Sequence, residues 1–159
     1  MKVYLMQHGE ARAEAEDPQR PLTGRGEDEV RRVSKVAKRL NLRPSKILHS
    51  GKLRAEQTAE ILVEGLGISP SPLQSAQGLN PNDDVRPWAE RIGSQNEDLM
   101  LVGHLPFLAK LASYLLGGRE DGNLVRFQNG AIVSLERNED RGWAVRWILT
   151  REMGPEVGM

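Results

Sequence analysis

The chain has 159 residues, a length that suits one compact domain better than two. Lys and Arg together number 22, as do Asp and Glu, so no overall field draws the protein toward nucleic acid or an anionic membrane. The absence of cysteine excludes disulfides, thiolate nucleophiles and thiolate metal sites. No apolar run approaches the ~20 residues of a membrane span, and no signal peptide pattern opens the chain, so we expect a cytoplasmic protein.

The first part of the chain alternates between apolar strands and amphipathic helices. Val3-Tyr4-Leu5-Met6 is a run typical of a buried strand, and Thr23 is expected to cap the first helix. Ser50 is expected to cap the second. The predicted elements are a strand over 2–7, a loop over 12–23, a helix over 24–40, a strand over 46–49 and a helix over about 52–66.

The second part continues the alternation and ends in two strands. The predicted elements are a loop over 69–84, a helix around 85–93, a strand over 99–102, a helix over 106–116, and strands over 131–137 and 143–149 joined by a hairpin turn. We therefore expect an α/β fold, a three-layer α/β/α sandwich whose mostly parallel sheet carries a C-terminal antiparallel hairpin at one edge. Residues 1–152 would form a single domain, and 153–159, which lack a core pattern, a mobile tail.

Two of the three histidines follow apolar strands directly. His8 stands in "LMQHGEA" between the first strand and Gly9, and His104 follows the run that ends at Gly103. Because parallel strands place their carboxyl ends at one edge of the sheet, the two histidines are expected to face one cleft, where such sheets bind ligands. The alternative is that each is a partly buried histidine with a purely structural role.

Arg54 is predicted to lie in the first turn of the helix after the second strand. Its guanidinium offers a fork of donors that suits phosphate oxygens, and the helix N-terminus adds positive potential. Two alternatives remain open: Arg54 is a surface arginine, or the histidines bind a metal. Two histidines without a third ligand make a poor zinc site, so we predict no metal and no cofactor.

Several blocks of the chain together resemble a known family. "MQHGEA", "RPLTGRG", "HSGKLRAEQTAEIL" and "LVGHLPFLAKL" are similar, in order and spacing, to the histidine phosphatase superfamily with its phosphoglycerate-mutase-like fold. The residues within these blocks resemble those of the SixA-type phosphohistidine phosphatases, and the resemblance extends from residue 1 to about 116. It implies a hydrolase in which His8 carries the phosphoryl group, with Arg54 and His104 also catalytic and with Gln7, Gly9, Arg20 and Leu105 lining the phosphate site.

The resemblance also implies the partners. The substrate would be a phosphohistidine-containing protein, for example a phosphotransfer domain, or a small phosphorylated compound, and inorganic phosphate would be the product. Neither nucleic acid nor a membrane is expected as a partner. For Arg20, a solvated loop cation is the alternative to a pocket residue.

One departure from the family pattern concerns the residue before the nucleophile. The family motif is Arg-His-Gly, whereas this chain has Gln7, which donates to a phosphate oxygen without charge and without a bidentate fork. A charge-assisted hydrogen bond is worth roughly 1.5–3 kcal/mol, so turnover suffers unless another cation, such as Arg126 or Arg12, substitutes. A non-catalytic phospho-ligand binding module is therefore an alternative function.

A second departure concerns the general acid. Larger members of the superfamily place a glutamate where this chain reads "QGLNPNDD", with Gly78 at the expected position and Asp83 and Asp84 nearby but off pattern. An alkoxide leaving group needs a proton, whereas the nitrogen of a phosphoramidate is easily protonated by solvent. The sequence thus favours phosphohistidine over phosphate monoesters, and a small-molecule phosphomonoesterase stays as the second alternative.

Overall fold

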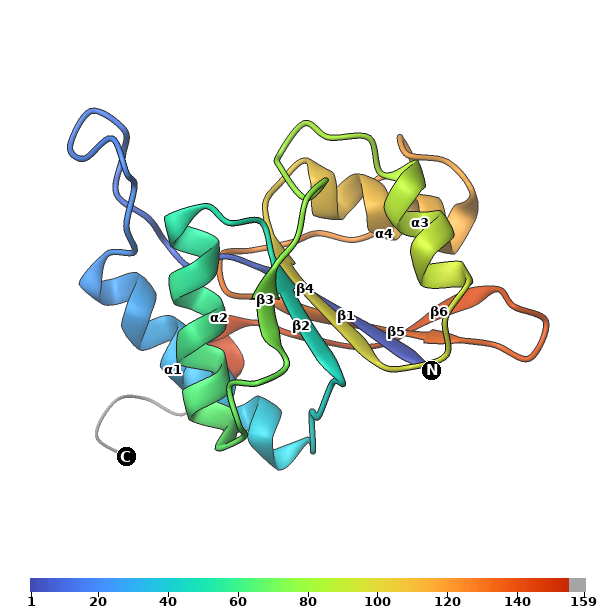
Figure 1. Ribbon diagram of the computed structural model, residues 1–159, viewed down its shortest axis with the longest axis horizontal. Coiled ribbons are helices and arrows are strands. Elements are labelled where there is room, and N and C mark those ends of the chain that lie inside the picture. The colour runs from blue at the N-terminus through green and yellow to red at the C-terminus, as the bar shows by residue number, and fades with distance from the viewer. Residues whose placement is uncertain (155–159) are drawn as a thin grey trace.

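The computed structural model describes residues 1–154, and its six strands form one sheet in the order β3-β2-β4-β1-β5-β6 (Figure 1). The strands are β1 (Lys2–Gln7), β2 (Lys46–His49), β3 (Leu73–Ser75), β4 (Leu99–Gly103), β5 (Ile132–Arg137) and β6 (Trp143–Leu149). The helices are α1 (Gly24–Arg39), α2 (Leu53–Leu66), α3 (Arg86–Gly93), α4 (Phe107–Gly117) and the short 3-10 helix η1 (Arg151–Met153). The pairs from β3 to β1 are parallel, and β5 and β6 add antiparallel strands, which confirms the predicted sheet.

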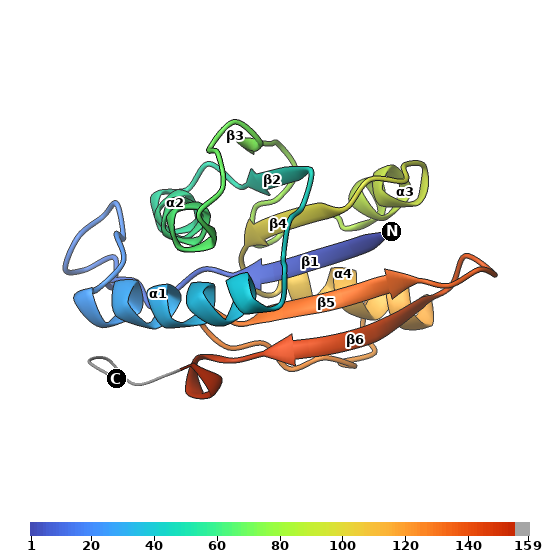
Figure 2. The same cartoon turned by 90° about the horizontal axis from the view of Figure 1, so that it is seen from below.

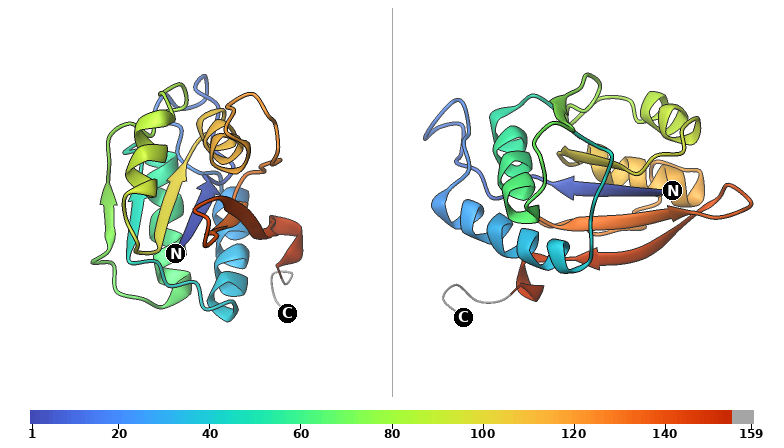
Figure 3. Two further views of the ribbon diagram at one scale, coloured as in Figure 1. Left: turned by 90° about the vertical axis from the view of Figure 1, so that its right-hand side faces the viewer. Right: turned by 60° about the horizontal axis from the view of Figure 1, so that its bottom comes forward.

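Helices cover both faces of this sheet, as Figures 2 and 3 show. On β1, Tyr4 and Met6 pack with apolar residues of α1 and α2, while Val3 and Leu5 pack with those of α3 and α4. Successive strand residues point to opposite faces, so a strand covered on both sides must be apolar throughout. The continuous apolar run at the start of the chain has this physical cause, and the predicted three-layer sandwich is confirmed.

Two local predictions were wrong. The stretch 69–84, predicted as a loop, contains β3, an edge strand that pairs with β2 through Ile47 and Leu73. Its three residues are too few, and too exposed, to show a strand pattern in the sequence. Ser50 was expected to cap α2, but the N-cap is Lys52 and it makes no side-chain capping bond.

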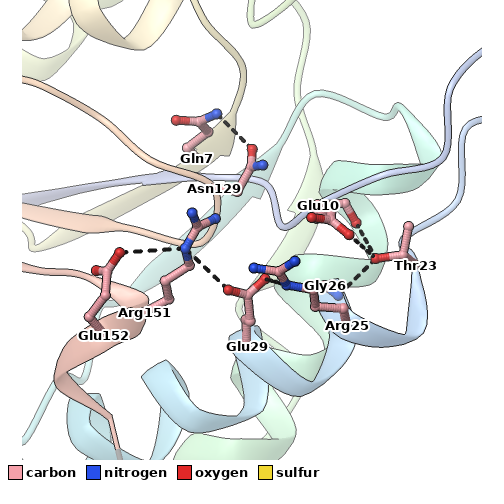
Figure 4. A network of polar contacts seen from close by, with 9 residues as sticks. All are labelled: Gln7, Glu10, Thr23, Arg25, Gly26, Glu29, Asn129, Arg151 and Glu152. Carbon is pink, nitrogen blue, oxygen red and sulfur yellow. Dashed lines mark hydrogen bonds and ion pairs between the residues drawn. The ribbon is translucent and has the colours of Figure 1, made fainter.

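The predicted cap of α1 is confirmed. The Thr23 hydroxyl accepts a hydrogen bond from the backbone N–H of Gly26 over 2.9 Å, and its own hydrogen goes to the Glu10 carboxylate, with 2.9 Å between the oxygens (Figure 4). Gly26 lies so close to the Glu10 backbone that a Cβ would overlap the Glu10 carbonyl. The first turn of α1 therefore holds the segment that follows β1 in place.

Strand register sets the position of the predicted site. Gln7 at the end of β1 pairs with Gly103 at the end of β4, so His8 and His104 are adjacent at the same edge of the sheet. On the other side of β4, His49 of β2 pairs with Val102, which brings Ser50 to this edge as well.

None of the helices in the described part of the chain is both long and apolar enough to cross a membrane. Of the tail expected to be mobile, Met153 ends η1 and Gly154 packs against Arg32. The rest of that tail, from residue 155 on, lies outside the described residues.

Candidate active site

The rings of His8 and His104 lie against each other at the carboxyl edge of the sheet. Their centroids are 5.1 Å apart with an angle of 52° between the planes, and His104 is only 1% exposed. Both side chains thus face one location, as expected from strands that are parallel neighbours.

Backbone contacts fix the tautomer of His8. Its Nδ1 lies 2.6 Å from the carbonyl oxygen of Gly9, and because a carbonyl only accepts, Nδ1 carries the hydrogen. Nε2 then holds a free lone pair. Burial, together with the smaller effects of the Arg54 and Arg20 charges, lowers the pKa of His8 to about 4 against the opposing effect of the Gly9 carbonyl. At neutral pH this ring is uncharged.

Gly9 is required by packing. A Cβ there would lie 2.8 Å from the Cγ2 of Val30 and 3.2 Å from the Gly26 carbonyl oxygen. The backbone N–H of Gly9 donates to the Thr58 hydroxyl over 3.0 Å, and that hydroxyl donates to the Arg54 carbonyl over 2.7 Å. Both backbone polar groups of Gly9 are therefore occupied, so this residue orients His8 rather than offering a free donor to a phosphate.

Thr58 was missed as a site residue in the sequence reasoning. It lies in the "LRAEQTA" block, one turn after Arg54 on α2, and it is fully buried. Its hydroxyl joins the helix that carries Arg54 to the loop that carries His8. The block contains Thr58, but its hydrogen-bond partner, Gly9, is 49 residues away in sequence. Only the fold shows that the two residues are in contact.

Arg54 lies in the first turn of α2, as predicted. Its Nε is buried and has no hydrogen-bond partner among the described residues. Burial lowers the pKa of Arg54, and the positive charge of Arg20 lowers it further. Two cations near enough to act on each other are the electrostatic setting of an anion site.

Arg20 approaches the histidines from the loop before α1. Its φ of 49° is in the left-handed region, and its Nε donates to the Arg12 carbonyl over 3.0 Å. A non-glycine residue is held in that region only when its surroundings impose it. The contacts thus keep Arg20 close enough for its charge to act on His8 and His104.

A further cation of the site is Lys52, which the sequence reasoning did not identify. Its charge acts on His104, together with the charges of Arg54 and Arg20. The expected substitutes were Arg12 and Arg126. The Arg12 guanidinium instead lies 4.0 Å from the Glu16 carboxylate, and Arg126 is exposed in the segment before β5. The available clue was the position of Lys52 in "HSGKLRAEQ", two residues before Arg54 at the start of α2.

His104 is held by a side-chain contact. Its Nε2 lies 2.6 Å from the Ser50 hydroxyl oxygen, while its Nδ1 is buried and has no partner among the described residues. Burial, together with the smaller electrostatic effects of His8 and Arg54, lowers the pKa of His104 to about 3. This ring is uncharged at neutral pH as well.

Gln7, where the family has arginine, is 9% exposed and points to Asn129, as Figure 4 shows. Its Nε2 donates to Asn129 Oδ1 over 2.9 Å, and its Oε1 is buried without a partner among the described residues. The next residue, Gly130, donates its N–H to the carbonyls of Gln7 and His8 over 3.0 and 3.1 Å. The loop before β5 thus fixes both residues at the end of β1.

Gly78 has a φ of +82°, and a Cβ there would lie 3.0 Å from Trp88 Nε1, so the backbone itself disfavours a glutamate. Asp83 and Asp84 make local contacts: one accepts the N–H of Asn80 over 2.8 Å, and the other pairs with Arg86 at 2.9 Å.

The space beside Ser50 is a cavity of about 590 Å³ that Gln77, Gly78 and Asn80 also line, and no lining residue is charged.

Leu105, directly after His104, is 38% exposed. In residues 1–154, no group of three or more His, Cys, Asp and Glu side chains could hold a metal ion.

Comparisons with known proteins agree with this geometry. Residues 3–80 match the histidine phosphatase superfamily (branch 1). The chain is 30% identical to the phosphohistidine phosphatase SixA of Escherichia coli over 94% of each chain, and 36% identical to an uncharacterised protein of Picosynechococcus over 89% of this chain and 88% of that one. A structure of the protein histidine phosphatase SixA with tungstate superposes with a TM-score of 0.83 at 28% identity, covering 95% of this chain and 97% of the other. The chain therefore belongs to the histidine phosphatase superfamily and is similar to its SixA members, a kinship that supports phosphatase activity.

Proposed function

We propose that this phosphatase hydrolyses phosphohistidine, in a protein or in a small phosphoramidate, through a phosphoryl group carried on His8. The observation that carries the proposal is the state of His8: neutral, with Nδ1 bound to the Gly9 carbonyl and Nε2 free beside His104. Such a nitrogen is a ready nucleophile, and splitting the transfer into two steps lowers the barrier of each.

In the first step, His8 Nε2 forms a bond to phosphorus while the bond to the substrate nitrogen breaks. The electron pair stays on that nitrogen, which takes a proton from solvent. In the second step, water attacks phosphorus, the bond to Nε2 breaks and inorganic phosphate leaves. Arg54, Arg20 and His104 would hold the phosphoryl oxygens, whose charge needs most stabilisation in the transition state.

The leaving-group side of the site supports phosphohistidine over a phosphate monoester. The cavity beside Ser50 and Gly78 has no charged lining residue, and the carboxylates of the adjoining cavity, Asp83 and Asp84, are bonded to Asn80 and Arg86. An imidazole leaving group does not need a carboxylic acid to protonate it. The E. coli relative carries phosphohistidine phosphatase in its name, which agrees with this preference.

The neutral pair of Gln7 and Asn129 favours the second candidate, a module that binds a phosphorylated ligand without turning it over. Gln7 removes one cation from beside His8, whereas Arg54, Arg20 and Lys52 still make the site attractive to an anion. Under this alternative the protein binds inorganic phosphate but has no activity.

One set of assays separates these functions. The purified chain is incubated with a protein phosphorylated on histidine, with free phosphohistidine and with an aryl phosphate, and phosphate release is measured. Turnover of the histidine phosphates with little release from the aryl phosphate supports the proposal. Equal or greater turnover of the aryl phosphate indicates a phosphomonoesterase. No turnover of any substrate, combined with phosphate binding, indicates the module.

A further inference from the structure

We infer that Ser50 is a positioning residue that holds His104 in the tautomer with its hydrogen on Nδ1, so that Nδ1 donates to a phosphoryl oxygen. The inference rests on the proposed function in so far as a phosphoryl group is what occupies the site. It begins from a contact that the expected capping role of Ser50 does not explain: its hydroxyl oxygen lies 2.6 Å from His104 Nε2.

The surroundings of the hydroxyl favour one direction of this bond. The Ser50 oxygen accepts a hydrogen bond from the backbone N–H of Lys52, over 3.3 Å, at the start of α2. A hydroxyl has one hydrogen to donate, and His104 Nε2 is within reach of it. If Ser50 donates this hydrogen to Nε2, then Nε2 is unprotonated, and a neutral imidazole carries its hydrogen on Nδ1.

The opposite tautomer leaves more groups unsatisfied. With the hydrogen on Nε2, the Ser50 hydroxyl would accept twice, and neither its own hydrogen nor the buried Nδ1 lone pair would find a partner among the described residues. Leaving a buried polar group unpaired costs about 1–3 kcal/mol, and this applies to Nδ1 rather than to the hydroxyl, because Ser50 is only half-buried. With the hydrogen on Nδ1, a single donor is left over, and it is the one that a bound phosphoryl oxygen would satisfy.

The tautomer matters because a neutral His104 binds a phosphoryl oxygen only through a hydrogen bond and not through a positive charge. The ring is 1% exposed, and its low pKa keeps it neutral at working pH, so only one of its two nitrogens donates. The ring lies beside that of His8, where a phosphoryl group would be attached. A lone pair on Nδ1 would repel a phosphoryl oxygen, whereas an N–H would bind it.

The test compares the wild-type chain with Ser50→Ala, Ser50→Thr and a matched control, Ser45→Ala. Ser45 is an exposed serine just before β2, at the opposite end of that strand from Ser50. Imidazole ¹⁵N spectra report the protonated nitrogen of His104, assigned with His104→Gln. Binding of inorganic phosphate and turnover of phosphohistidine are measured on the same proteins.

We expect the wild type to show protonated Nδ1 and unprotonated Nε2, and Ser50→Ala to shift toward the other tautomer. Phosphate affinity and kcat/KM should each fall about tenfold or more, a scale typical of removing the partner that orients a functional histidine. Ser50→Thr should restore both the spectrum and the affinity, and Ser45→Ala should change neither.

A wild-type spectrum with hydrogen on Nε2 would overturn the inference. So would a Ser50→Ala protein that keeps the tautomer, or one whose tautomer changes without loss of phosphate affinity. The wild-type spectrum does not depend on the folding of any Ser50 variant, because only His104→Gln is needed to assign it. Absence of phosphohistidine turnover in the wild type would count against the proposed function alone, because the spectrum and phosphate binding are measured without substrate.

Discussion

The backbone N–H of Gly9 donates to the hydroxyl of Thr58 over 3.0 Å, and this bond joins the loop that carries His8 to helix α2. Thr58→Val keeps the shape of the side chain but removes the hydroxyl, which leaves a buried N–H without an acceptor. We expect a loss of about 1–3 kcal/mol in the free energy of unfolding. Turnover should also fall, because the same bond positions His8 relative to Arg54. Chemical denaturation and steady-state kinetics measure the two effects, and Thr58→Ser, which retains the hydroxyl, should lie close to the wild type in both.

Arg54→Ala should reduce kcat/KM by about two to three orders of magnitude, the usual scale for loss of one preorganised transition-state donor. The buried, unpartnered Nε of Arg54 indicates that its guanidinium is held for a ligand. Arg43→Ala, at an exposed arginine before β2, is the matched control and should leave the rate unchanged. A rate for Arg54→Ala within a few-fold of the wild type would remove Arg54 from the phosphoryl site.

Gln7→Arg should raise the rate of phosphohistidine hydrolysis by roughly tenfold, the gain from one charge-assisted contact. Asn129 Oδ1, which now accepts from the Gln7 amide, can accept equally from a guanidinium, so the arginine keeps this anchor while its other donors face the site. Steady-state kinetics with phosphate affinity in parallel measure the gain, and Gln7→Met controls for loss of the amide. If the arginine variant is no faster and binds phosphate no more tightly, Gln7 is an integral part of this pocket rather than a deficit.

Acid should destabilise the fold through its three histidines, because burial lowers the pKa of each of them. The folded-state pKa values of His8 and His104 are about 4 and about 3, both below the ordinary value of 6.5. Between pH 6.5 and these folded-state pKa values, the unfolded chain binds more protons than the native one. The free energy of unfolding therefore has its full value above pH 6.5 and decreases as the pH falls toward 4. Denaturation midpoints across this range measure the slope, and His104→Gln should make it shallower. A slope that His104→Gln leaves unchanged would contradict the assigned pKa of His104.

The same pKa values shape the activity profile. His8 stays neutral well below pH 6.5, so turnover should not fall with the titration of an ordinary histidine, and its acid limb should lie near pH 4. Rates corrected for spontaneous hydrolysis of phosphohistidine provide the measurement. An acid limb near 6.5 would show that His8 is more solvated than its position implies.

The sequence was most informative where local pattern and sheet geometry coincide. Apolar runs that end in His8 and His104 predicted two neighbouring strand ends, because a parallel sheet brings all such ends to one edge. Arg54 could be placed because a helix start after a strand lies at that same edge. These inferences need only the order of strands and helices along the chain.

What the sequence could not provide were contacts between distant segments. Ser50 looked like a helix cap, yet its hydroxyl bonds to a histidine 54 residues later. Gln7 looked like an isolated loss of charge, yet it pairs with Asn129, 122 residues away. Strand β3 is too short and exposed for a pattern, and the lowered pKa of His8 depends on its burial in the folded chain. Each of these depends on which segments the fold places side by side.

The most direct test of the mechanism is to trap the phosphoryl group on the protein. The chain is mixed with a protein carrying radiolabelled phosphohistidine, denatured in alkali within the first turnover, digested and analysed by mass spectrometry. The account predicts label on the peptide that contains His8, released more slowly from Gln7→Met than from the wild type and absent from His8→Asn. Turnover without any labelled His8 peptide, or equal turnover by His8→Asn, would contradict a covalent intermediate on His8.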